Sequence, residues 1–194
     1  MSNIVEAIRL IYPDIQGGFT YWETEYNCNN WQNPVDGLVW ENNNYPKPSW
    51  SQITEKINQL SLINAKKDKI SKINNQRDSR LIQNTPQTLN VYQGTNLVSK
   101  QFQVNPACYA QWNARIKLLE ERKASGEQNP TYPWIALDNE IYDLTLNDFK
   151  SLLSHLVDRE NTEHIQARLR KDAVNVLTTI QEVEAFDITQ ILIP

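Results

Sequence analysis

The stretch "KPSWSQITEKINQLSLINAKKDKISKINNQRDSRLIQ", Lys47–Gln83, is a long helical pattern in which most residues are polar. Ser49 and Gln52 have the spacing of a capping box directly after Pro48, which predicts where the helix begins. Its apolar stripe consists of Ile53, Ile57, Leu60 and Ile63. Farther on, apolar residues are sparse and no strict heptad register survives. Because so polar a helix cannot be buried in one small domain, we expect a solvated connector or one strand of an oligomeric bundle.

The residues before this helix predict a small domain of one helix and one aromatic hairpin. An apolar face at helical spacing precedes Pro13, which ends the first helix. "GGFTYWETEYN" (17–27) and "PVDGLVWEN" (34–42) follow with strand-like alternation and turn signals. The apolar face is formed by Ile4, Ala7, Ile8 and Ile11. This pattern predicts an N-terminal helix and aromatic hairpin domain over residues 1–50.

This small domain contains more aromatic side chains than one helix and one hairpin can cover, since each buried ring needs about 150–250 Å² of contact. We therefore expect some of them to contact a protein partner, while core packing and sugar binding remain alternatives. Trp40 and Trp50 are expected to be packing anchors, whereas Trp31, flanked by amides, stays open to a partner or a sugar. The candidate partner-binding residues are Trp22, Trp31, Tyr45, Ile57 and Leu60.

The residues after the long helix predict a second globular part made of hairpins and helices. A hairpin turns at 93–95, Asn105 and Pro106 begin a helix, and Gly126 ends it. A second hairpin turns at Asp138–Asn139, and Thr145 caps a further helical pattern that extends to 177. A short helix, "TIQEVEAFD", and an apolar tail, "ITQILIP", close the chain.

The predicted fold class is therefore α+β, with three segments along the chain. They are the N-terminal domain 1–50, the long polar helix or connector 51–84, and the C-terminal hairpin and helical domain 85–194. The boundary between the two globular parts is expected inside the polar helix, near 65–85.

No motif for catalysis or cofactor binding stands out. His155 and His164 are nine residues apart and point to opposite sides of a helix, so they do not form a metal pair. No glycine-rich phosphate loop and no nucleophile elbow occurs. The carboxylate pairs Glu23/Glu25 and Asp138/Glu140 have strand spacing that a glycosidase could use, but such pairs are common on exposed strands. We predict no enzyme activity, no cofactor and no metal site.

Charge and composition limit the classes of partner that the protein is expected to bind. The net charge is −4 and the pI is near 5.3, which argues against a nucleic-acid partner. No apolar run approaches a membrane span, and the first residues lack the features of a signal peptide. Cys28 and Cys108 are expected to be unpaired thiols in a reducing compartment. "AKKDKISK" (65–72) is interpreted as a solvated helix face, with contact to an acidic partner as the alternative.

Two segments resemble bacteriophage tail proteins. Residues 129–189 resemble a domain of unknown function near the C-terminus of phage tail-fibre and tail-assembly proteins: a hairpin, a helix opening with "LT", a polar stretch, a second helix, and a short helix with an "AFDIT"-like end. Residues 1–60 resemble small proteins of phage tail modules in "IRLIYPDIQGGFTYW", "NPVDGLVWEN" and "YPKPSWSQI". Relative to that pattern, residues 61–128 are extra material.

This resemblance implies a tail-fibre or baseplate-associated subunit of the virion tail that is assembled in the host cytoplasm and contacts other tail or fibre proteins. A homo-oligomer, with a trimer favoured, fits a helix with isoleucine at several seam positions. A tail-fibre assembly chaperone, absent from the mature particle, is the alternative. A receptor-binding module that reads a host-surface glycan is the second alternative.

Overall fold

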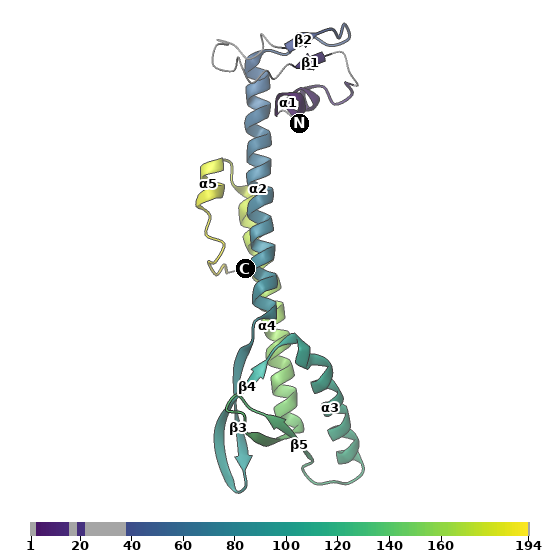
Figure 1. Cartoon of the computed structure of the whole chain (residues 1–194), viewed down its shortest axis with the longest axis vertical. Coiled ribbons are helices and arrows are strands. Elements are labelled where there is room, and N and C mark those ends of the chain that lie inside the picture. Colours follow the sequence, from purple (N-terminus) through teal and green to yellow (C-terminus); the bar gives the residue numbers. More distant parts are fainter. Residues whose placement is uncertain (1–2, 16–18, 22–37, 194) are drawn as a thin grey trace. The chain divides into compact units, whose positions relative to one another are not determined.

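The computed structural model describes residues 3–15, 19–21 and 38–193, and its fold class is α+β (Figure 1). The helices of this described part are α1 (Asn3–Ile11), α2 (Trp50–Ile82), the 3-10 helix η2 (Pro106–Cys108), α3 (Tyr109–Ala124), α4 (Leu146–Val176) and α5 (Ile180–Ala185). Its strands are β1 (Phe19–Tyr21), β2 (Leu38–Trp40), β3 (Thr85–Gln93), β4 (Asn96–Val104), β5 (Thr131–Ile135) and β6 (Ile141–Thr145). They pair as three antiparallel hairpins, β1–β2, β3–β4 and β5–β6.

The chain forms two compact units, and each unit is made of two separate stretches of the sequence. The first unit comprises Met1–Ile70 and Val174–Asp187, and the second comprises Ser71–Ala173 and Ile188–Pro194. Helices α2 and α4 therefore each contribute to both units. This division cuts across the segments 51–84 and 85–194, because the first unit gives way to the second after Ile70 within α2 and resumes at Val174 in the last turn of α4.

The core of the first unit joins α1, β2 and α2. It consists of Ala7, Ile8, Leu38 and Ile53, all nearly or fully buried. Trp40 and Trp50 pack against this cluster, which agrees with their predicted role as anchors. Trp40 also donates its indole N–H to the carbonyl oxygen of Tyr45 at 2.8 Å. The Tyr12 hydroxyl donates to the Pro46 carbonyl at 2.8 Å, so the segment leading into α2 is fixed from both sides.

The start of α2 confirms the predicted capping box. The Ser49 N–H donates to Oε1 of Gln52 at 2.8 Å, and the Gln52 N–H donates to Oγ of Ser49 at 3.3 Å. Each side chain thus satisfies a backbone donor that the first helical turn leaves without a partner. The helix begins at Trp50, as the sequence indicates.

Two lysines of "AKKDKISK" donate hydrogen bonds to backbone carbonyls within the first unit. Nζ of Lys66 donates to the Asn175 carbonyl in the last turn of α4 at 2.7 Å. Nζ of Lys69 donates to the carbonyls of Glu184 and Phe186, at the end of α5, at 2.9 and 3.0 Å. Ammonium groups at these positions satisfy carbonyls that helix C-termini leave unpaired. The prediction of a solvated face is therefore wrong for these two lysines.

The second unit is built around the longest hairpin. Strands β3 and β4 pair along their whole length around a two-residue loop, where Gly94 has φ 63°. Alternate residues face the core. The core consists of Leu89, Val91, Phe102, Val104, Trp112, Leu119, Ala136, Tyr142, Leu144, Phe149, Leu152 and Leu156. The predicted turn at 93–95 is confirmed, and β3 begins already at Thr85.

A single continuous helix, α4, follows the β5–β6 hairpin. The two helices with a polar stretch between them, implied by the resemblance, are therefore corrected to one. Within the second unit, Arg159 in this polar stretch of α4 contacts the junction between α2 and β3. Its guanidinium donates to the carbonyls of Leu81 and Gln83 at 3.0 and 2.9 Å, and also bonds Oγ1 of Thr85. These contacts satisfy the last carbonyls of α2 and position the start of β3.

Candidate functional site

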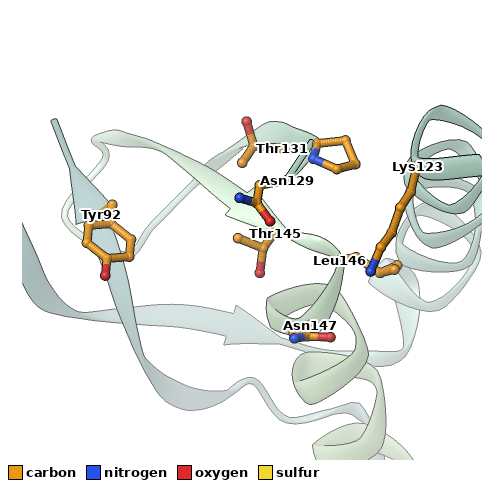
Figure 2. A pocket seen from close by; sticks show the side chains of 8 residues that line it. Tyr92, Lys123, Asn129, Thr131, Thr145, Leu146 and Asn147 are labelled. Carbon is orange, nitrogen blue, oxygen red and sulfur yellow. The ribbon is translucent and has the colours of Figure 1, made fainter. Parts of the chain in front are cut away.

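A cavity of about 410 Å³ opens in the second unit, where four elements end or begin (Figure 2). Its lining comes from the end of β3, the last turn of α3, the loop into β5, and the β6–α4 junction. The lining residues are Tyr92, Lys123, Asn129, Pro130, Thr131, Thr145, Leu146 and Asn147. The volume lies within the range of about 300–1,000 Å³ that small-molecule sites occupy.

The loop that forms one wall of the cavity starts at a Schellman motif. The Gly126 N–H donates to the Lys123 carbonyl at 3.1 Å, and the Glu127 N–H donates to the Arg122 carbonyl at 3.2 Å. Gly126 has φ 97°, a backbone conformation that side chains with a Cβ rarely adopt. The predicted helix stop at Gly126 is thus confirmed, and it directs the chain toward the cavity.

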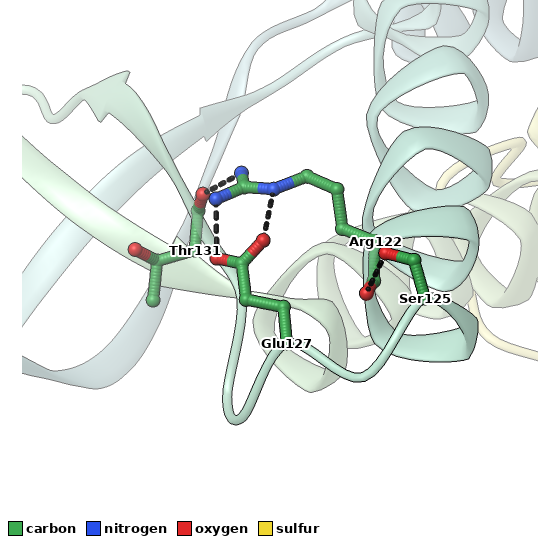
Figure 3. A network of polar contacts seen from close by, with 4 residues as sticks. All are labelled: Arg122, Ser125, Glu127 and Thr131. Atoms are coloured by element: carbon green, nitrogen blue, oxygen red, sulfur yellow. Dashed lines mark hydrogen bonds and ion pairs between the residues drawn. The ribbon is translucent and has the colours of Figure 1, made fainter.

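An ion pair holds the same loop against β5 (Figure 3). Nε of Arg122 donates to Oε2 of Glu127 at 2.6 Å, and Nη2 bonds the other carboxylate oxygen. Nη1 of Arg122 donates to the Thr131 carbonyl at 2.9 Å. One guanidinium therefore fixes both ends of the segment that carries Asn129, which itself has φ 52°. Bidentate pairing adds geometric restraint to the charge attraction.

The opposite wall is the capped start of α4. The Asp148 N–H donates to Oγ1 of Thr145 at 3.2 Å, while Oδ2 of Asp148 accepts from the Thr145 N–H and hydroxyl at 2.8 and 2.6 Å. The predicted Thr145 cap is confirmed. Asn147, which lies between these two residues in sequence, lines the cavity together with Thr145 (Figure 2).

The cavity presents polar groups that the rest of the described chain does not use. Within the ranges that the structure describes, the side chains of Tyr92, Lys123, Asn129, Thr131 and Asn147 make no hydrogen bond or ion pair with the rest of the chain. No carboxylate lines the space, so the ammonium group of Lys123 is the only formal charge among its lining residues. The arrangement can offer an aromatic face, two amides, hydroxyls and one cation to a small polar ligand.

The predicted partner-binding residues do not line this cavity. Tyr45 is half-buried and packs against Tyr12 in a tilted arrangement with ring centroids 4.9 Å apart. Ile57 and Leu60 are half-buried and pack against the core of the first unit. Trp22 and Trp31 lie outside the described residues, as do Cys28, Glu23 and Glu25. Sequence reasoning missed the cavity because its residues are dispersed over four elements. Local signals mark Asn129–Pro130 as a turn and Thr145 as a helix cap, but they do not place these residues in one site.

Asp138 of the second carboxylate pair has a structural role in the β5–β6 turn. Its Oδ2 accepts from Nζ of Lys100 at 2.7 Å and from the Tyr142 hydroxyl at 3.1 Å. The Lys100 ammonium lowers the pKa of Asp138, and the Glu140 N–H adds to this effect while burial opposes it. Asp138 in turn raises the pKa of Lys100. Glu140 is exposed and supplies its N–H to this turn rather than a second carboxylate.

The histidines and the described cysteine lie on different elements, α4 and η2. His155 is half-buried and His164 is exposed, both on α4. The Cys108 thiol is free, and burial raises its pKa. Across the described ranges, no group of three or more His, Cys, Asp and Glu side chains is placed to hold a metal ion. Nor does any helix in those ranges have the length and apolar character needed to cross a membrane.

The chain is a mixed helix and hairpin protein whose second unit contains a small cavity with polar lining residues. Comparison with known families matches residues 64–190 to the family described as a domain of unknown function, DUF4376. The match spans more than half of the chain, and the protein belongs to this family. No curated protein and no solved structure matches the chain. The match to this family includes residues 64–128 together with 129–190.

Proposed function

We propose that the protein is a structural component of a bacteriophage tail, a tail-fibre or baseplate-associated subunit that acts through protein–protein contacts. The resemblance of residues 1–60 and 129–189 to phage tail proteins supports the assignment to a tail. The surface of the β5–β6 hairpin supports the mode of action.

One observation carries this proposal: two neighbouring apolar side chains of the β5–β6 hairpin are exposed to solvent. Ile135 and Ile141 are directly opposite each other in the strand register and are 57% and 66% exposed. Leu137, just beyond β5, is 48% exposed. Solvent-facing strand positions are usually polar, and contiguous exposed apolar side chains are typical of protein-binding surfaces. The proposed occupant is another tail or fibre protein.

The composition of purified virions tests the proposal directly. Mass spectrometry of particles from the phage that encodes the chain should find its peptides in a fixed ratio to other tail proteins. Absence from mature particles, together with presence during fibre assembly, would support the chaperone alternative instead.

The contact surface has its own test. Replacing Ile135 and Ile141 by serine should lower incorporation into particles without lowering the Tm, because both side chains already face solvent. Val176→Ser is the matched control, since Val176 is 76% exposed on a different element. Equal incorporation of the double variant and the control would argue against this surface.

The proposed homo-oligomer, with a trimer favoured, depends on the apolar stripe of α2. Ile57 and Leu60 contact the core of their own unit, so their replacement by aspartate would also disturb folding. Ile63, at the end of the same stripe, is 44% exposed and is the better probe. Light scattering should give an oligomer mass for the wild type and for Asn64→Asp, and a monomer mass for Ile63→Asp. A monomer mass for the wild type would contradict the proposal that the apolar stripe of α2 is an oligomer interface.

A further inference from the structure

The cavity of the second unit combines the groups that recognise a sugar. Tyr92 lines the cavity and is 61% exposed, so its ring is available to a ligand. Figure 2 places Tyr92 on one side and Lys123 on the other, with Asn129, Thr131 and Thr145 between them. A flat ring beside amides and hydroxyls suits a ligand with an apolar face and several hydroxyl groups.

Other ligand classes fit the same lining less well. A divalent cation needs oxygen ligands that include carboxylates, and none lines the cavity. A phosphate group usually meets arginine or several cations, whereas Lys123 is the single cation here. A purely apolar ligand would leave the amides of Asn129 and Asn147 without partners.

The charge of the lining residues further limits the class of ligand that fits the cavity. Lys123 has no acidic neighbour among the lining residues, so its ammonium is available to an anionic substituent. Leu146 and Asn147 form the first turn of α4, where the helix dipole is positive. Asp148 offsets part of this potential, but its carboxylate is directed into the Thr145 cap. The anion preference therefore rests on Lys123.

We propose that this cavity binds a single acidic sugar unit, a pyranose that carries a carboxylate. Its ring lies against Tyr92, its hydroxyl groups bond Asn129, Thr131 and Asn147, and its carboxylate pairs with Lys123. The Arg122–Glu127 pair keeps the Asn129 loop in position, so the site needs little rearrangement to accept the ligand (Figure 3). This site goes beyond the proposed structural role and does not depend on whether the chain remains in the virion.

The test uses the full chain with two simple probes, methyl β-glucuronide and methyl β-glucoside. Isothermal titration or ligand-observed NMR should detect both, with the glucuronide bound roughly fivefold more tightly, as expected for a solvent-accessible ion pair. Lys123→Met should abolish this preference and leave glucoside binding unchanged. Tyr92→Ala should weaken both sugars roughly fivefold or more, whereas Tyr92→Phe retains them because it keeps the ring face.

Matched controls separate the site from general effects. Lys117→Met changes an exposed lysine of the same helix, and Tyr109→Ala changes an aromatic residue that is 49% exposed elsewhere in the unit. Both should bind like the wild type, and circular dichroism should show that all variants are folded. Absence of binding to either sugar would overturn the proposal. So would unchanged binding in Tyr92→Ala, or displacement of the glucuronide by equal concentrations of inorganic phosphate. None of these outcomes bears on the virion composition, which is measured separately.

Discussion

The side-chain amide of Gln166 pairs with the backbone of Leu192 through two hydrogen bonds. Nε2 donates to the Leu192 carbonyl at 2.8 Å, and the Leu192 N–H donates to Oε1 at 2.9 Å. Arg170, one turn farther along α4, donates Nε to the Gln190 carbonyl at 2.8 Å. The apolar tail is thus held by its backbone, while Ile191 and Ile193 remain 81% and 91% exposed.

Gln166→Ala should release the end of this tail. The loss of hydrogen bonds worth about 1 kcal/mol should make the Leu192 amide exchange with solvent roughly fivefold faster. NMR-detected hydrogen exchange measures this rate. His164→Ala, an exposed position on the same helix, serves as the control and should leave the rate unchanged. Equal rates in both variants would show that the amide does not anchor the tail.

Arg159→Ala should destabilise the second unit by about 2–3 kcal/mol, because it removes charged hydrogen bonds to the Leu81 and Gln83 carbonyls at the end of α2. Urea unfolding measures the change. Arg168→Ala removes an exposed pair with Asp172 and should cost less than about 0.5 kcal/mol. Similar losses in the two variants would contradict a special role for Arg159.

Gly126→Ala should cost about 1–2 kcal/mol of stability, because a residue with a Cβ is strained at φ 97°. Among the described residues, no heavy atom beyond the two chain neighbours lies within 4 Å of the added methyl group, so the cost comes from the backbone conformation rather than from crowding by other parts of the fold. Gly126→Asn should cost less, since asparagine tolerates positive φ. Thermal unfolding should therefore order the Tm values as wild type, Asn and Ala. An alanine variant as stable as the wild type would exclude strain at this turn.

The charge of Asp138 makes the β5–β6 turn sensitive to acid. Its pKa is lowered from the ordinary 3.8, chiefly by Lys100, so its contribution to stability is present above pH 3.8 and is lost as the pH falls through the folded value. Lys100→Met should move the titration of the Asp138 carboxyl carbon, followed by NMR, to higher pH. The same titration midpoint in both proteins would contradict the pairing.

Local signals in the sequence predicted much of the secondary structure. The Ser49–Gln52 capping box, the Gly126 stop and the Thr145 cap each depend on neighbouring residues, and each lies where the sequence indicates. The continuous course of α4 was harder to predict from the sequence. Arg159 ties α4 to the end of α2 within the second unit through carbonyls more than 70 residues away in sequence, and no local pattern reports such a partner.

The cavity could not be predicted from the sequence either, because its residues come from distant parts of the chain. Tyr92 and Asn147 are polar residues of ordinary appearance in a strand and a helix, and only the packing of β3 and α4 in one unit places them around the same space. Conversely, conspicuous residues such as Ile57 proved to contact the core of their own unit. Abundance of aromatic or apolar residues signals burial as readily as it signals binding.

The interleaving of the two units has a practical consequence for fragments and fusions. The second unit interrupts the first between Ile70 and Val174, so a cut at one point in the chain cannot yield both units intact. A fragment that stops before 174 lacks the carbonyls that Lys66 and Lys69 bind. To isolate the first unit, a designer would have to bridge α2 directly to the last turn of α4 with a new linker.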